Sequence, residues 1–162
     1  MVYLYFGSKE ELFVACIRRE AGRLMEMISD VVEPGESPRD QLWHALRAFF
    51  GFVSAHRGAW SVLYLQARNQ GGPFAVEAQQ MRRDTVVLTS QLLARAEDVP
   101  GPPDEQVGAA AHALVGACES LADWMIDHPD ADPEVTAHRV LRFVWPGLSA
   151  MMEPASSGSE PG

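Results

Sequence analysis

The chain has 162 residues, and its 22 Asp and Glu against 13 Lys and Arg give a formal net charge of −9. This length suits one globular domain, and the acidic balance argues against a strong nucleic-acid-binding surface, which needs a basic stripe to displace counterions from phosphate. No apolar run approaches the roughly 20 residues of a membrane span, and no secretory signal follows Met1, so we expect a cytoplasmic protein with no membrane partner.

The first predicted helix covers residues 8–32. Ser8 is a good N-cap, and Glu11 three residues later completes a capping box. Phe6 can close a hydrophobic staple across this cap. The apolar side of the helix is expected to consist of Leu12, Cys16, Leu24, Ile28 and Val31.

Breaks rich in proline and glycine separate the later helices. Ser37–Pro38 and Asp132–Pro133 each supply an N-cap followed by proline at the first helical position. Further helices are expected at about residues 37–56, 59–68, 74–97, 104–128 and 133–152. The Pro, Ser and Gly content of residues 153–162 is typical of a disordered tail. The pattern predicts an all-α fold, a bundle of about six helices.

The two cysteines, Cys16 and Cys118, lie far apart in the sequence and belong to no C-x-x-C pair. Each falls on the apolar side of a helical pattern. We expect both to be small buried hydrophobic residues rather than a disulfide or a metal site.

The stretch Y-L-Y-F-G-S-K-E-E-L-F at residues 3–13 resembles a junction in the TetR/AcrR (tetracycline-repressor) family. There the recognition helix of a helix-turn-helix runs into a Tyr-x-Tyr-Phe-x-Ser-Lys-Glu-Glu-Leu sequence. The resemblance implies that Tyr3, Tyr5 and Lys9 contact operator phosphates, which suits a phenol or an ammonium at a helix N-terminus. The alternative is that Tyr3 and Tyr5 only pack the junction.

The resemblance also implies a division of the chain. Residues 1–7 would be a remnant of the recognition helix and junction, because the family places most of its helix-turn-helix ahead of this motif. Residues 8–152 would be the effector-binding and dimerisation domain of a transcriptional regulator, in the repressor mode. We expect this chain not to bind operator DNA by itself. The alternative is a helical ligand-binding or protein-interaction module with no transcriptional role.

A pocket for a small apolar or aromatic effector is a further implication of the resemblance. Large side chains that could converge on it come from the second to the fifth predicted helix: Trp43, Phe50, Trp60, Tyr64, Met81, His112 and Trp124. The polar groups that could orient a ligand are Arg68, Arg82, His112 and Glu119. The alternative is that the aromatic residues simply fill the core.

The last two helices are the candidates for a homodimer interface. Small residues on the fifth would let another helix approach closely, and the sixth is apolar nearly all round. The representative interface residues are Ala113, Ala117, Val140, Phe143 and Val144.

Catalysis has little support, since the chain contains no G-x-S-x-G, no glycine-rich phosphate loop and no H-E-x-x-H. Glu134 and His138 are spaced to share a metal with Asp130 or His128. However, an acid in a first helical turn and a surface histidine need no metal. We expect neither a cofactor nor a metal, and no enzyme activity.

Overall fold

The computed structural model describes residues 9–61, 64, 72–96 and 105–152. Within these ranges every regular element is a helix, which confirms the all-α prediction. The helices are α1 (Lys9–Val31), α2 (Pro38–Ala55), α3 (Arg57–Ala59), α5 (Gly72–Ala96), α6 (Glu105–Asp127) and α7 (Pro133–Met152).

Two of the helix starts follow the capping signals in the sequence. Ser37 accepts a hydrogen bond from the backbone N–H of Asp40 at 3.2 Å, and Asp132 accepts one from the N–H of Val135 at 2.9 Å. Each cap satisfies a backbone donor that has no partner inside its helix. In the turn before α2, Gly35 has a φ of 106°, a conformation that glycine adopts without strain.

The third helix differs from its prediction. It begins at Arg57 rather than Ala59 and ends at Ala59. Trp60, Ser61 and Tyr64 follow in a wider, π-helical turn, a form that occurs mostly as short bulges and often near functional sites. The rest of the predicted segment, like the Ser8 cap and the Phe6 staple, lies outside the described residues.

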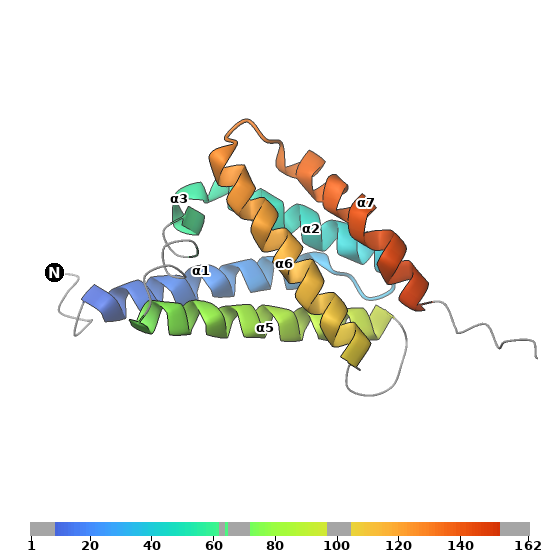
Figure 1. Ribbon diagram of the computed structural model, residues 1–162, viewed down its shortest axis with the longest axis horizontal. Helices are drawn as coiled ribbons and strands as arrows, with labels where there is room; N and C mark the ends of the chain where they lie inside the picture. The colour runs from blue at the N-terminus through green and yellow to red at the C-terminus, as the bar shows by residue number, and fades with distance from the viewer. Residues whose placement is uncertain (1–8, 62–63, 65–71, 97–104, 153–162) are drawn as a thin grey trace, which may run out of the picture.

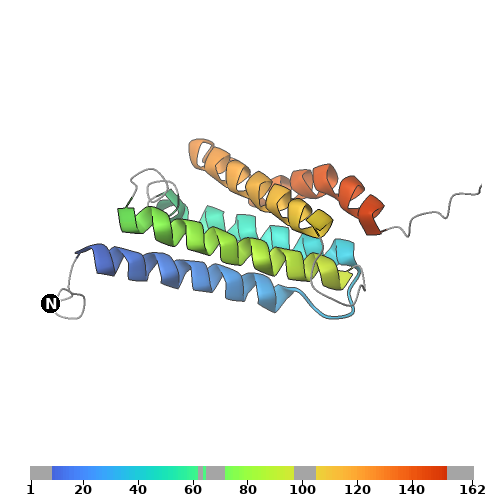
Figure 2. The same cartoon turned by 60° about the horizontal axis from the view of Figure 1, so that its bottom comes forward.

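The long helices form two layers (Figures 1 and 2). In both views α1 and α5 lie side by side and run in the same direction, while α2 runs the opposite way beside them. Helix α6 crosses this layer obliquely and packs mainly on α5, and α7 packs mainly on α2. Because α6 and α7 cover one side of the layer, a space enclosed on several sides can form between the two layers.

The buried side of α1 is rotated from the predicted one. Ile17 and Leu24 are buried on α1, whereas Cys16 is exposed. The prediction that Cys16 is buried was therefore wrong. The side chain that packs against Ala78 and Met81 of α5 is that of the next residue, Ile17. The prediction for Cys118 is confirmed, since this residue is buried on α6. Among the described helices none is long and apolar enough to cross a membrane.

Candidate functional site

An apolar cavity lies between the two layers. Side chains from α1, α2, α5, α6 and α7 line it, together with Trp60 and Tyr64 of the π-helical turn, and it encloses about 130 Å³. Engineered apolar cavities of about 150 Å³ stay dry and bind benzene. The space in this protein is therefore large enough to receive a small apolar molecule.

One end of the cavity is aromatic. The ring of Trp60 stacks on Tyr64 with centroids 4.0 Å apart, and Phe49 meets Trp60 edge to face at 5.5 Å. Trp60 is 1% exposed, and its indole N–H donates a hydrogen bond of 3.0 Å to Asp123 on α6. The polar atom of this buried indole is thus satisfied, and its ring is free to border the cavity.

The same end carries a carboxylate. Glu119 lines the cavity and accepts a hydrogen bond of 2.9 Å from the Nε of Arg82 on α5. Burial raises the pKa of the Tyr64 phenol, and the negative charges of Glu119 and Glu20 raise it further. Tyr64 is therefore a neutral phenol at physiological pH.

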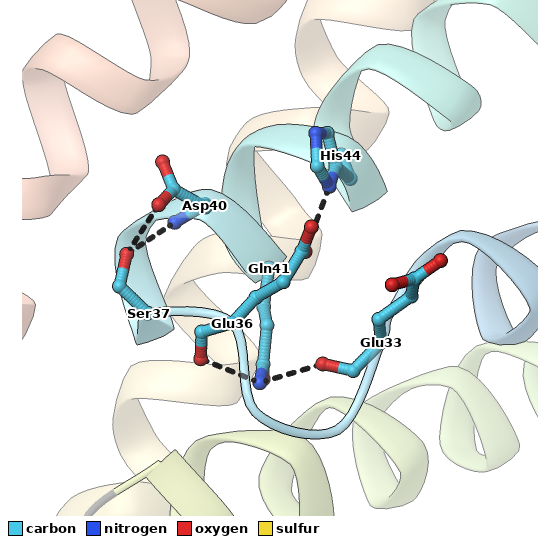
Figure 3. A network of polar contacts seen from close by, with 6 residues as sticks. All are labelled: Glu33, Glu36, Ser37, Asp40, Gln41 and His44. Carbon is cyan, nitrogen blue, oxygen red and sulfur yellow. Dashed lines mark hydrogen bonds and ion pairs between the residues drawn. The ribbon is translucent and has the colours of Figure 1, made fainter.

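The other end of the cavity abuts the turn between α1 and α2. Gln41 lines the cavity there, and its side-chain amide donates hydrogen bonds to the carbonyl oxygens of Glu33 at 3.2 Å and Glu36 at 3.1 Å. Figure 3 shows these bonds beside the Ser37 cap and the contact of 2.9 Å between Glu36 and His44. Gln41 therefore ties the turn that follows α1 to the start of α2 from within the cavity wall.

The wall between the two ends is apolar. Thr85 and Thr89 of α5 line it, but their hydroxyls donate to the carbonyls of Met81 and Thr85 at 2.9 and 2.8 Å. Cys118 also lines it, and burial raises the pKa of its thiol to about 12, with a smaller contribution from the charge of Glu119. The thiol is thus protonated at neutral pH and acts as a small apolar group.

The family model for the "Tetracyclin repressor-like, C-terminal domain" matches residues 38–147. The chain belongs to this family. Its members are transcriptional regulators that act as dimers, binding DNA and small-molecule effectors, and they are not enzymes.

Individual relatives agree with this assignment. A TetR-like transcriptional regulator from Rhodococcus sp. RHA1 has a crystal structure with 40% sequence identity and a TM-score of 0.73, covering 92% of this chain and 76% of that one. A second TetR-family structure from Rhodococcus RHA1, 22% identical, has a TM-score of 0.70 over 91% of this chain and 77% of its own, and shows the shared fold. The HTH-type transcriptional activator FasR of Mycolicibacterium smegmatis is 22% identical over 150 residues, which are 92% of this chain and 67% of FasR.

In this TetR-type domain only two of the seven predicted pocket residues, Trp60 and Tyr64, line the cavity. Phe50 and Met81 are core residues instead. Trp43 makes an edge-to-face contact with His138 at 5.9 Å. The other two do not line this cavity: His112 is exposed, and Trp124 is 37% exposed and stacks on His128.

Two of the polar residues that were predicted to orient a ligand lie at the cavity. Glu119 lines the cavity, and Arg82 pairs with it. Arg68 lies outside the described residues, as do Tyr3 and Tyr5 at the junction. Lys9 is exposed as the first residue of α1, so its contact with operator phosphate stays a prediction. The sequence did not indicate that Gln41 lines the cavity. The one feature that sets this residue apart in the sequence is its position shortly after Ser37, the N-cap of α2.

The predicted dimer surface of the TetR-type domain is partly exposed. Phe143 is 81% exposed on α7, and Ala113 is exposed on α6. Ala117 and Val144 are half-buried. Val140 is 2% exposed and packs in the core with Leu141. In the described part of the chain, no group of His, Cys, Asp or Glu is arranged to hold a metal ion.

Proposed function

We propose that this chain is the effector-binding and dimerisation part of a cytoplasmic TetR-family regulator, and that a small apolar or aromatic effector binds in the cavity between the helical layers. The observation that carries the proposal is the position of α1 in the cavity wall, where it contributes Leu24, Met25 and Ile28. Helix α1 begins at Lys9, within the junction motif of residues 3–13. An effector in the cavity would therefore contact the helix that leads to the DNA-binding side.

The contacts of α1 suggest how occupancy would be transmitted. Arg18 binds Glu77 of α5 with hydrogen bonds of 2.6 and 2.9 Å, and Gln41 of α2 holds the turn that follows the opposite end of α1. Between these two attachments, Leu24, Met25 and Ile28 of α1 border the cavity. An effector that binds one placement of α1 more tightly than another shifts the population towards it. In a dimer, a shift of α1 would change the spacing between the two DNA-binding domains. Recognition of the two operator half-sites depends on that spacing.

We propose that the dimer forms through α6 and α7. Phe143 projects from α7, and Ala113 leaves room beside α6 for a second helix. Burial of the Phe143 ring by a second subunit would remove its apolar surface from water, which is favourable. The self-complementary pairing of two such surfaces gives the closed two-fold dimer common among soluble oligomers.

Binding of Nile red, a neutral apolar dye whose emission rises in apolar surroundings, tests the cavity. The protein should bind the dye with a saturable increase in emission. Ala45→Phe, which places a ring in the cavity wall, should weaken this binding at least about tenfold, the effect of losing roughly 1.4 kcal/mol. Ala55→Phe puts the same ring at an exposed position of the same helix and should leave binding unchanged. Equal binding by all three proteins would refute an effector site in this cavity.

The sign of regulation is a separate part of the proposal. We propose repression, as the family resemblance implies, although FasR carries the name of an activator. A reporter gene under an operator that a complete regulator recognises distinguishes the two modes. Loss of the regulator should raise expression if it represses, and lower expression if it activates. The polypeptide of residues 1–162, with its net charge of −9, should not retard operator DNA in a gel.

A further inference from the structure

The side-chain amide of Gln41 has one polar atom that the protein itself does not use. Its Nε2 donates to the carbonyl oxygens of Glu33 and Glu36 at 3.2 and 3.1 Å, one hydrogen for each (Figure 3). These bonds also decide which amide atom is the nitrogen, since an oxygen in its place would face two other acceptors. The oxygen, Oε1, accepts no hydrogen bond from the described part of the chain. Its lone pairs are therefore left for another donor.

This oxygen is not sealed inside the protein. Gln41 is half-buried, and no side-chain nitrogen or oxygen of the described residues is both fully buried and without a partner. Gln41 lines the cavity, and so do Val32 of the preceding turn and its neighbours on α2, Pro38 and Leu42. The amide thus offers an accessible acceptor where the nearby wall residues are apolar.

Other polar groups of the wall are engaged elsewhere. Thr85 and Thr89 are held to the backbone of α5 by their hydroxyls, and the sulfur of Cys118 is a weak acceptor. At the aromatic end, Glu119 already forms an ion pair. Gln41 is the neutral amide of the wall, with both donors used and its acceptor left over.

We propose that Gln41 selects the effector, which is an apolar molecule carrying a neutral hydrogen-bond donor, such as a hydroxyl, at the end that reaches the turn between α1 and α2. This specificity rests on the proposed function of the cavity. A donor on the ligand replaces the water that Oε1 loses when the cavity fills. A ligand without a donor covers the oxygen and leaves it unpaired, which is unfavourable.

The same contact acts on the turn that follows α1. A hydrogen bond accepted at Oε1 polarises the amide and makes its N–H groups stronger donors. Those N–H groups hold Glu33 and Glu36, which lie between the end of α1 at Val31 and the start of α2. A ligand with a donor therefore tightens the attachment of this turn to α2.

Two isomeric ligands test the specificity in the wild-type protein. Decanol can donate a hydrogen bond, whereas methyl nonyl ether has the same atoms in an unbranched chain and can only accept one. Displacement of Nile red should give decanol a dissociation constant about three- to tenfold lower than that of the ether, the size of one net hydrogen bond. An ether that binds as tightly as decanol would overturn the specificity.

Substitutions locate the source of the preference. Gln41→Met removes the amide but keeps a side chain of similar length, and the preference for decanol should disappear. Gln79→Met makes the same change at an exposed position of α5, and Tyr64→Phe removes the phenol of the aromatic end; both should keep the wild-type ratio. A wild-type ratio in Gln41→Met, or loss of the preference in Tyr64→Phe instead, would contradict the assignment to Gln41.

Nuclear magnetic resonance of the isotopically labelled wild type gives a readout that needs no substitution. Decanol should shift the side-chain NH₂ resonances of Gln41 more than the ether does, because only decanol donates to the oxygen of this amide. Equal shifts with the two ligands would count against the contact.

The failure of the specificity and the failure of the site give different results. If the site is correct and the specificity wrong, both isomers displace Nile red equally well and both are weakened by Ala45→Phe. If the site itself is wrong, neither isomer competes with Nile red and Ala45→Phe has no effect. Thermal unfolding of each variant by circular dichroism confirms that the compared proteins are folded.

Discussion

The indole N–H of Trp60 donates a hydrogen bond of 3.0 Å to the carboxylate of Asp123, across 63 residues of sequence. Nearby, the guanidinium of Arg57 donates to the carbonyls of Met125 at 2.7 Å and Pro129 at 3.0 Å, which caps the C-terminal end of α6. These bonds fix the aromatic end of the cavity to α6. A ligand that enters the cavity therefore meets a firm aromatic wall on this side.

Replacing Trp60 by phenylalanine tests this anchor. The smaller ring cannot donate to Asp123, and it leaves unfilled space in the core. We expect the free energy of unfolding in urea to fall by about 1–3 kcal/mol, the cost of a lost buried hydrogen bond partner. Trp124→Phe, at a position that is 37% exposed, should change it by less than about 0.5 kcal/mol. Equal effects of the two substitutions would contradict the role of the Trp60 bond.

The dimer surface is tested by Phe143→Glu. A carboxylate at the centre of an apolar contact between two subunits would be desolvated without a partner, which is strongly unfavourable. Light scattering after size-exclusion chromatography should show a dimer for the wild type and a monomer for the variant. Val76→Glu alters an α5 residue that is 63% exposed, and it should remain a dimer. A monomeric wild type, or a dimeric Phe143→Glu variant, would disprove the proposed surface.

The cap of α2 is tested by Ser37→Ala. The hydroxyl of Ser37 accepts from the N–H of Asp40 and donates to its carboxylate at 2.7 Å (Figure 3). Loss of this cap should lower the free energy of unfolding by about 1 kcal/mol. Ser29→Ala changes an exposed serine inside α1 and should have almost no effect, because alanine favours a helix interior. A loss as large for Ser29→Ala would show that the cap is not the cause.

The two thiols should differ in reactivity. Cys16 is exposed, and Cys118 is buried with its thiol pKa raised to about 12. An aromatic disulfide reagent at pH 8 should therefore modify one thiol per chain in the native protein and both in concentrated urea. Rapid modification of both thiols in the native state would mean that the wall around Cys118 is open to solvent.

The same thiol makes stability depend on pH in alkali. Because its pKa is higher in the folded protein than the ordinary value of 9.0, ionisation favours the unfolded chain. Its contribution to stability is fully present below pH 9 and is lost as the pH rises from 9 to about 12. Cys118→Ala should make the free energy of unfolding less dependent on pH in this window, and Cys16→Ala should not. Equal slopes for the two variants would contradict the assignment.

Much of the fold could be predicted from local signals. Ser37–Pro38 and Asp132–Pro133 mark the starts of α2 and α7 because a side-chain oxygen and a fixed φ act within one turn of helix. The prediction for 133–152 matches the bounds of α7. The short third helix was predicted less well, since the π-helical turn at Trp60 depends on its tertiary bond to Asp123.

The cavity was harder to predict because its wall depends on how the two layers meet. Aromatic size selected Trp60 and Tyr64, which line the cavity, but the same criterion also selected Trp124, which is 37% exposed. Most of the wall consists of ordinary leucines, such as Leu42 and Leu88, whose spacing is that of any buried helix face. The way in which α6 packs on α5 and α7 packs on α2 decides which of these side chains border the cavity.

The position of a bound apolar ligand is the most direct test of the central claim, that this TetR-type domain holds its effector between α1 and the opposite layer. A crystal structure of the protein with decanol would measure it. We predict electron density for the ligand between Trp60 and Gln41, with contacts to Leu24 and Ile28 of α1. A cavity that stays empty at saturating decanol, or a ligand bound only elsewhere on the protein, would contradict the claim.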